Sequence, residues 1–420
     1  MAITVEIAFL ILGGIIVIGY FGELLSKRFA IPTALLLLVM GYGLKLTGFV
    51  DVGDFIGIQD LFGSLALIVL LFDGGMSLNI MEVLFKSGKV LVVGLLITVF
   101  SMIGAAALFY AFGFDPLIGA ILGAIAGGIG SSTTISIAKS ISIPEEIRNF
   151  LTLESSITDI FSIILALVLT QALISGILDI QVIAQGIVGK FAIGIFIGLI
   201  TGIAAMLALS RIEKGYNYMV TFAMVLLLYS VAEFLNGSGA IAVLAFGLVI
   251  GNETLIRKII HSQEVEGNPL IQQFQKEISF FIRTFFFVFL GIVVTLGNAK
   301  NFALAFMAMV MLYIIRYAVI KYATANSPHS KYRNILTAIN PRGLATAVLA
   351  TYPLIVVEGQ LRSGADGHLE ALLPQLSGLS EIAFYIIILS IIFTTVLVPL
   401  ANPKKVGEAV DDGGLKQVKL

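Results

Sequence analysis

Residues 153–161 read Leu-Glu-Ser-Ser-Ile-Thr-Asp-Ile-Phe and place the acidic side chains of Glu154 and Asp159 inside an otherwise apolar segment. Ser155 precedes Asp159 by four residues, so on a helix their side chains share one face, while Glu154 is rotated by about 100° from Ser155. If the helix starts near residue 147, Asp159 lies roughly 18 Å along a span that needs about 30 Å. A carboxylate at that depth costs at least about 2.5 to 3.5 kcal/mol on insertion scales and marks the movement of ions or protons.

The composition of the whole chain is that of an integral membrane protein. Of 420 residues, 58% are hydrophobic and only 12% are charged, whereas a soluble domain carries about 25% charged residues. The formal net charge of −1 and the lack of long basic runs exclude a nucleic-acid surface, and the absence of Cys excludes disulfides and thiolate chemistry. His261, His329 and His368 fall in polar connecting segments and are expected to be solvated rather than metal ligands.

Apolar runs long enough to cross a bilayer recur along the chain. A span needs roughly 20 residues, which predicts an all-α polytopic protein. We expect thirteen transmembrane helices, near residues 4–22, 31–48, 61–80, 89–112, 116–138, 147–171, 184–209, 217–235, 238–252, 270–296, 300–322, 335–357 and 381–401. The first is expected to be a retained helix, because it lacks the basic leader of a signal peptide. Residues 1–401 are thus predicted to form a single membrane domain and residues 402–420 a short cytoplasmic tail.

The distribution of Lys and Arg predicts the orientation, because positive charge gathers in cytoplasmic loops. Of the 25 Lys and Arg residues, eighteen lie in the odd-numbered connections, at the span ends next to them or in the tail, and four lie in or next to the even-numbered connections. The remaining three are inside spans: Arg283, Arg316 and Arg342. This split predicts a plasma-membrane protein with its N-terminus outside and its C-terminus in the cytoplasm.

Two predicted spans are interrupted at matching positions. If residues 1–171 and 217–401 are inverted repeats joined by a linker helix at 184–209, the fifth and twelfth spans correspond. The fifth contains Gly127-Gly128-Ile129-Gly130, and the twelfth contains Asn340-Pro341-Arg342-Gly343. Proline removes a backbone donor, and glycine lowers the cost of non-helical backbone. Paired breaks of this kind indicate a binding site near the bilayer midplane.

The face of the sixth span that carries Asp159 offers oxygen atoms suited to a hard monovalent cation. Ser155 and Thr158 supply hydroxyl groups, and the break in the fifth span supplies freed carbonyls. The same carboxylate can bind a proton, and binding either a cation or a proton, but not both, is by itself an exchange mechanism. The alternative is an aspartate that caps or hydrogen-bonds a neighbouring helix.

Other charges inside spans need partners. Glu154 and Arg342 are expected to form an ion pair, because leaving either one alone when buried would cost about 3 to 5 kcal/mol. A compatible alternative has Arg342 bonding the carbonyls freed at its own break. Arg283 and Arg316 are expected to be structurally paired rather than in contact with the ion, and Asp73 is expected to line the entrance.

Two further features of the predicted helices concern structure rather than chemistry. Glu233 lies near an external helix end and is expected to be solvated. Gly194, Gly198 and Gly202 stand four residues apart in the seventh span. Such a ridge of small residues allows close helix contact without implying a dimer interface.

Together these residues resemble the monovalent cation/proton antiporter superfamily, in particular its NhaP-like sodium/proton exchanger branch, over essentially the whole chain. The segments that carry the resemblance are Leu71-Phe72-Asp73-Gly74-Gly75, Glu154-Ser155-Ser156-Ile157-Thr158-Asp159, Tyr229-Ser230-Val231-Ala232-Glu233, Gly237-Ser238-Gly239, Arg283 with the aromatic run after it, and Pro341-Arg342-Gly343. The resemblance implies the NhaA-like antiporter fold, a homodimer of thirteen-helix protomers, crossed broken helices and a core domain that moves against a dimerisation domain. It also implies Asp159 as the shared carrier of cation and proton, Ser155 as a ligand, and Glu154 paired with Arg342.

The chain departs from this branch at two places. The branch has Thr-Asp-Pro at the break in the fifth span, where this chain has Ile129-Gly130-Ser131, so no second carboxylate comes from that helix. The following Ser131-Ser132-Thr133 resembles the potassium-efflux branch, and we expect Ser132 to support the site. Thr158 stands where the branch has Asn. These departures leave the choice between Na⁺ and K⁺ open.

The leading hypothesis is electroneutral exchange of Na⁺ for H⁺ without a cofactor and without enzymatic activity. A K⁺/H⁺ antiporter of the same fold is the alternative within the class. A cation channel is the alternative from another class, and transport that saturates at channel rates would reveal it. The predicted spans lack the serine and histidine pair, or the paired aspartates, that an intramembrane protease requires. A dinucleotide-binding enzyme is also excluded, because Gly128-Ile129-Gly130 is not followed by the third glycine of the binding loop.

Overall fold

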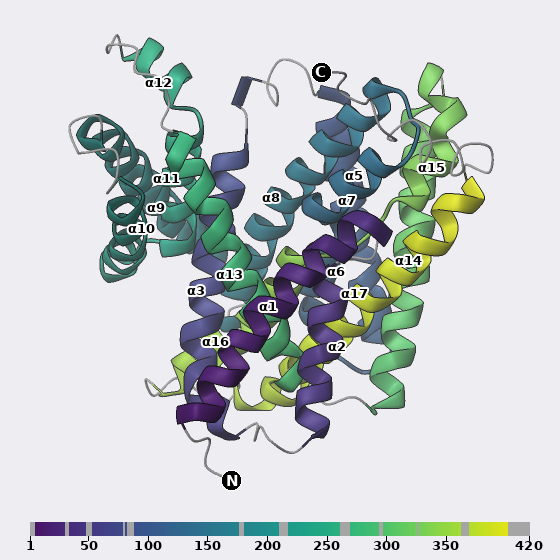
Figure 1. The fold of residues 1–420 in the computed structure, drawn as a ribbon, viewed down its shortest axis with the longest axis horizontal. Helices are drawn as coiled ribbons and strands as arrows, with labels where there is room; N and C mark the ends of the chain where they lie inside the picture. The colour runs from purple at the N-terminus through teal and green to yellow at the C-terminus, as the bar shows by residue number, and fades with distance from the viewer. Residues whose placement is uncertain are drawn as a thin grey trace, which may run out of the picture.

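The computed structural model describes residues 5–29, 33–47, 53–78, 80–81, 88–175, 180–209, 217–260, 269–293, 297–325, 327–362 and 369–401. Within these ranges all regular secondary structure is helical (Figure 1). The predicted tail at 402–420 lies outside the described residues, as do His261 and His368.

The helices follow the apolar runs of the sequence, and polar residues begin several of them. Asp115 accepts a hydrogen bond from the backbone N–H of Leu117 at 2.7 Å and caps α6, whose first residue is Pro116. Glu145 and Glu146 occupy the first turn of α8, where negative charge stabilises the helix dipole. The α-helices are α1 (Val5–Phe29), α2 (Thr33–Leu46), α3 (Gly53–Ser77), α5 (Gly88–Ala111), α6 (Pro116–Gly127), α7 (Ser131–Ser140), α8 (Glu145–Ser175), α9 (Ile180–Leu209), α10 (Asn217–Phe234), α11 (Gly239–Gly251), α12 (Glu253–Ile259), α13 (Pro269–Val293), α14 (Ala299–Ala323), α15 (Arg333–Ala338), α16 (Leu344–Arg362) and α17 (Leu373–Ala401). Short 3₁₀ turns, η1 (Pro328–Tyr332) and η2 (Glu370–Leu372), precede α15 and α17.

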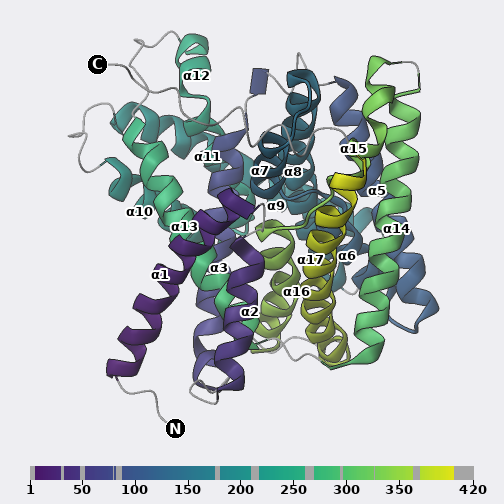
Figure 2. The same cartoon turned by 45° about the vertical axis from the view of Figure 1, so that its right-hand side comes forward.

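Each range predicted to span the membrane coincides with one of these helices or with a pair of them. Two spans are pairs, α6 with α7 and α15 with α16. By length and composition alone, six of the described helices are long and apolar enough to cross a membrane, or seven if α11 and α12, bent by 82°, count as one span. The number of thirteen crossings therefore stays a prediction. The start of α1 and the end of α17 lie toward opposite faces of the bundle, as an odd number of crossings requires (Figures 1 and 2).

The helices pack into two groups, and each group takes its members from both halves of the chain. In the first, which we call the panel group, α11 packs against α3 and α9, α13 packs against α2, and α1 and α10 complete the set. In the second, the core group, α5 packs against α6, α6 against α8, and α14 against α17, with α7, α15 and α16 between them. The groups meet mainly where α3 contacts α16 and α8 (Figure 2).

The small-residue ridge of α9 faces α11 inside the panel group. A Cβ added at Gly194 would lie 2.6 Å from the Ser238 carbonyl oxygen, and one at Gly198 would lie 2.8 Å from the Ala245 Cβ. A Cβ at Gly202 would lie 2.9 Å from the Val249 Cβ. The predicted close helix contact is therefore confirmed, and it joins two helices of one chain.

Two predictions about surface side chains change in the structure. His329 is only partly exposed, and its Nε2 lies 2.9 Å from the Glu146 carboxylate, so this histidine joins η1 to the start of α8 rather than standing free in solvent. Glu233 is exposed, but its carboxylate accepts a hydrogen bond from the Gly239 N–H at 2.7 Å and so helps to begin α11. Both side chains were predicted to be simply solvated, and both instead contact another part of the chain.

Candidate functional site

Both predicted helix breaks are present, and they cross each other in the core group. The first runs from the end of α6 at Gly127 to the start of α7 at Ser131, with Gly128 and Gly130 in extended conformations. The second runs from Ala338 to Leu344 and contains Pro341, which has no N–H to continue a helix.

The two breaks touch through backbone atoms. The N–H of Gly130 donates to the carbonyl oxygen of Pro341 at 2.8 Å. A Cβ on Gly130 would lie 3.0 Å from the backbone nitrogen of Gly343, so glycine permits this approach. Thr346 in α16 donates its hydroxyl to the carbonyl of Ile125 in α6 at 3.1 Å, which satisfies one acceptor that the end of α6 leaves free.

Asp159 reaches the first break from α8. Its Oδ2 accepts a hydrogen bond from the Ser131 hydroxyl at 2.8 Å and a longer one from the Ser131 N–H at 3.4 Å. The side chain is half-buried, and it stands at the N-terminus of α7, where the helix dipole and unbonded N–H groups favour a negative charge. Asp159 and Ser131, predicted from the sequence to belong to one site, are thus in direct contact.

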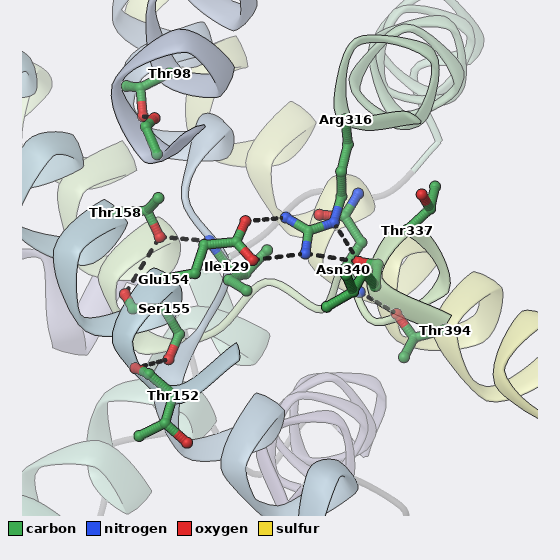
Figure 3. A network of polar contacts seen from close by, with 12 residues as sticks. Thr98, Ile129, Thr152, Glu154, Ser155, Thr158, Arg316, Thr337, Asn340 and Thr394 are labelled. Atoms are coloured by element: carbon green, nitrogen blue, oxygen red, sulfur yellow. Dashed lines mark hydrogen bonds and ion pairs between the residues drawn. The ribbon is translucent and has the colours of Figure 1, made fainter. Parts of the chain in front are cut away.

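Thr158 and Ser155 extend the same helix face toward the break. The Thr158 hydroxyl accepts from the N–H of Ile129 at 3.3 Å and donates to the carbonyl of Ser155 at 3.2 Å (Figure 3). The Ser155 hydroxyl donates to the carbonyl of Thr152 at 2.9 Å, which leaves its lone pairs available as a ligand (Figure 3). Both hydroxyl groups are buried.

Glu154 pairs with Arg316 of α14, so the predicted pair of Glu154 with Arg342 is wrong. Arg316 Nη1 lies 2.5 Å from Glu154 Oε1, and Arg316 Nη2 lies 3.0 Å from Oε2, a two-point contact between side chains at most 1% exposed (Figure 3). Arg316 also donates twice to the Leu336 carbonyl near the end of α15. The structural pairing expected for Arg316 is confirmed, and both Glu154 oxygens are already bound by protein.

Arg342 is buried at the second break and bonds the backbone around it. Its Nη1 donates to the Asn340 carbonyl at 3.2 Å and to the Asn340 side-chain oxygen at 2.7 Å. This confirms the alternative reading, in which Arg342 satisfies a carbonyl freed by the break. Sequence reasoning missed Asn340, although an amide beside a proline in a broken helix is itself a signal for backbone satisfaction.

Asp73 and Arg283 lie on helices of the panel group rather than at the crossing. Asp73 is exposed at the end of α3, close enough to Asp159 for electrostatic interaction. Arg283 is half-buried in α13. Ser132 belongs to the first turn of α7, but its side chain lies outside what the structure describes. Among the described residues, no group of three His, Asp or Glu side chains is arranged to hold a metal ion.

A helical membrane bundle in which two broken helices cross beside a carboxylate has the architecture of a secondary transporter. The transmembrane sodium/hydrogen exchanger family matches residues 13–402. The chain belongs to this family of transporters, and the predicted class of monovalent cation/proton antiporters is confirmed.

Individual relatives are similar to this chain in sequence and in fold. A probable Na(+)/H(+) antiporter 2 of Methanocaldococcus jannaschii is 30% identical over 348 residues, which cover 78% of this chain and 79% of that protein. A K(+)/H(+) antiporter NhaP2 of Shewanella sp. strain ANA-3 is 24% identical over 79% of this chain, and the alignment covers only 58% of that longer protein. The solved sodium proton antiporter MjNhaP1 of M. jannaschii superposes with a TM-score of 0.75 at 20% identity, covering 96% of this chain and 99% of that one. This last likeness confirms the predicted fold.

Proposed function

We propose that this chain exchanges Na⁺ for H⁺ by alternating access, with Asp159 binding the cation or the proton in competition. The contact between the Asp159 carboxylate and Ser131 at the first break carries the proposal. This contact places a carboxylate, which either a cation or a proton can neutralise, beside the non-helical backbone of the first break.

The cation ligands in this proposal come from α8 and from the first break. Asp159 supplies the charge, Ser155 and Thr158 supply hydroxyl oxygens, and Ile129 and Ser131 line the other side. Gly130 serves the site indirectly, because its N–H binds Pro341 and its carbonyl accepts from Thr134. Glu154 acts as a neighbour rather than a ligand, because Arg316 binds both of its oxygens.

The exchange is proposed to be electroneutral. One carboxylate carries either one Na⁺ or one H⁺, so both half-cycles move the same charge as long as the other buried groups keep theirs. The pairing of Glu154 with Arg316 supports this, because it neutralises the buried glutamate of α8 and leaves Asp159 as the titrating carboxylate of the site.

K⁺ in place of Na⁺ is the second candidate. Gly130 stands where the NhaP-like pattern has a second carboxylate, and Ser131 beside it offers a hydroxyl. Several relatives of 23 to 25% identity are named K(+)/H(+) antiporters. A site with fewer charges and more neutral oxygens suits the larger, more weakly hydrated ion.

The setting of this activity is also a proposal. The excess of Lys and Arg in alternate connections supports a plasma-membrane protein with an external N-terminus and a cytoplasmic C-terminus. The matching positions of the two breaks support inverted repeats over 1–171 and 217–401, linked by the helix at 184–209. Assembly as a homodimer follows from the family resemblance alone.

Proton flux in proteoliposomes, followed with a pH-sensitive dye and challenged in turn by Na⁺, Li⁺ and K⁺, tests the proposal. Asp159→Asn is expected to abolish exchange of every cation. Asp115→Asn is the matched control, because this aspartate caps α6 away from the crossing, and it should retain exchange. Full activity in Asp159→Asn would overturn the proposed carrier.

Clamping the membrane potential in the same vesicles tests electroneutrality. The initial rate is expected to be the same at zero potential and at an imposed potential of either sign, at constant pH and cation gradients. A rate that follows the potential would contradict a one-for-one exchange. Flux at the rates of an ion channel would contradict alternating access itself.

A further inference from the structure

Two hydroxyl groups of α17 bind the backbone of the second break. The N–H of Arg342 donates to the Ser390 Oγ at 2.8 Å, and the N–H of Asn340 donates to the Thr394 Oγ1 at 3.3 Å. All four residues are at most 1% exposed. Between the two amides stands Pro341, which has no N–H, so these hydroxyls accept from both donors that flank it.

The spacing of the two hydroxyls matches the spacing of the two amides. Ser390 and Thr394 are four residues apart on one face of a helix, a rise of about 6 Å. Asn340 and Arg342 are two residues apart in non-helical backbone, and extended backbone advances about 6.6 Å over two residues. The earlier hydroxyl, Ser390, bonds the later amide, Arg342, so the two segments run in opposite directions. With this matched spacing, one turn of α17 offers one acceptor to each of the two amides.

Each hydroxyl is also held by a second partner, which fixes its orientation. Ser390 donates to the carbonyl of Ile387 at 2.7 Å. The Thr394 hydroxyl lies 3.3 Å from the hydroxyl of Tyr313 in α14. The Tyr313 hydroxyl in turn donates to the Ala338 carbonyl at 3.5 Å. An alanine or valine in place of either residue removes the acceptor and leaves a buried N–H without a partner.

A continuous path of bonds runs from these hydroxyls to the carboxylate of the site. Ser390 holds the N–H of Arg342, and the adjoining carbonyl of Pro341 accepts from Gly130. The next residue, Ser131, binds Asp159. A shift in the second break is therefore passed to the atoms that face the cation.

We infer that Ser390 and Thr394 are positioning residues for cation exchange, which hold the second break so that Gly130 and Ser131 present the first break to Asp159. This role rests on the proposed function. It assigns to α17 a part in cation affinity although neither hydroxyl touches the site.

Amide hydrogen exchange of the purified protein tests the contacts without any transport. In Ser390→Ala and Thr394→Val, the amides of Arg342 and Asn340 respectively are expected to exchange at least about tenfold faster than in the wild type. Thr394→Val keeps the shape of the side chain. Unchanged exchange at both amides would overturn the contacts on which the role depends.

Transport kinetics test the role itself. Both variants are expected to raise the apparent KM for Na⁺ about threefold to tenfold with little change in the maximal rate. Ser390→Thr and Thr394→Ser, which keep a hydroxyl, should restore the wild-type KM. Ser377→Ala is the matched control, because its exposed hydroxyl lies on the same helix and donates to the local Pro374 carbonyl.

The outcomes separate the two proposals. Faster amide exchange with an unchanged KM would overturn the positioning role while leaving the exchange function intact. A loss of maximal rate that the hydroxyl-preserving variants do not rescue would also overturn it. A wild-type protein that exchanges no cation would overturn the proposed function, and with it the transport role of both hydroxyls, although amide exchange would still decide the contacts.

Discussion

The buried pair of Glu154 and Arg316 sets the charge around the candidate site. The guanidinium donates to both oxygens of the carboxylate and makes two further hydrogen bonds to the Leu336 carbonyl. Neither side chain is more than 1% exposed. A buried charge that loses such a partner has no water to replace it. Removing one partner is therefore strongly destabilising, although the intact pair adds little to the net free energy of folding.

Removing the arginine alone should therefore be far more damaging than removing both charges. Arg316→Met is expected to lower the free energy of unfolding by about 3 to 5 kcal/mol. Glu154→Gln combined with Arg316→Met should recover part of that loss, because no bare carboxylate remains. Thermal unfolding in detergent measures both.

An exposed pair provides the control for this experiment. Arg362 lies 3.8 Å from Glu358 at the end of α16 and is 66% exposed. Arg362→Met should change the free energy of unfolding by no more than about 0.5 kcal/mol. If Arg316→Met melted like Arg362→Met, the buried pair would have no structural role.

Among the elements, the crossing of the two broken helices depends on which glycine faces which backbone. A Cβ at Gly130 would lie 3.0 Å from the nitrogen and 3.2 Å from the Cα of Gly343. A Cβ at Gly343 would lie 3.6 Å from the Cα of Gly130, an ordinary contact. The two glycines touch each other, yet only one of them is required to lack a side chain.

Alanine substitution at these two positions should separate their roles. Gly130→Ala pushes one backbone against another and is expected to destabilise the protein by about 1 to 3 kcal/mol. It should also raise the apparent KM for the cation, because Ser131 moves with it. Gly343→Ala should leave both quantities close to wild type. Equal effects of the two substitutions on unfolding and on transport would contradict the observed crossing.

At the scale of the whole molecule, close backbone approach holds helices together. The ridge of α9 packs on α11 within one protomer. This contact belongs to the panel group, away from the crossing in the core group. It is therefore expected to contribute to the folding of the chain itself.

A bulky residue in this ridge should damage the fold of the protomer itself. Gly198→Val is expected to destabilise the protein by about 1 to 3 kcal/mol or more, because its side chain would meet Ala242 and Ala245. Gly189→Val on the same helix is the control, since no atom of the described residues lies within 4 Å of a Cβ there. Melting temperature and elution volume of the two variants give the measurement. A stable Gly198→Val that only changed the oligomeric state would contradict this assignment.

Much of this architecture follows from local properties of the chain. Apolar length predicts where helices run, because a span of about 30 Å needs roughly 20 such residues wherever it occurs. The breaks at Gly127-Gly128 and at Pro341 were predictable for the same reason, since proline and glycine act on their own turn of helix. The shared face of Ser155 and Asp159 needs only the helical repeat.

Partner choice between helices was not predictable in this way. Arg316 and Arg342 are both arginines inside apolar spans, and nothing in the spacing along the chain says which one faces Glu154, 162 residues before Arg316. The packing of α14 against α5 and α17 brings Arg316 to the carboxylate, and the bonds to Asn340 hold Arg342 at its own break. The sequence reasoning therefore found the charges and paired them wrongly.

Helix position, helix breaks and the face that Asp159 shares with Ser155 can be deduced from the order of residues, because each depends on neighbours within a few turns. Other features depend on the folded bundle: the pairing of charges, the contact of Gly130 with Pro341, and the hydrogen bonds that Ser390 and Thr394 accept from the second break. Their physical reason is that a buried polar group must be satisfied by whatever the packing places beside it, and that neighbour comes from a remote part of the chain.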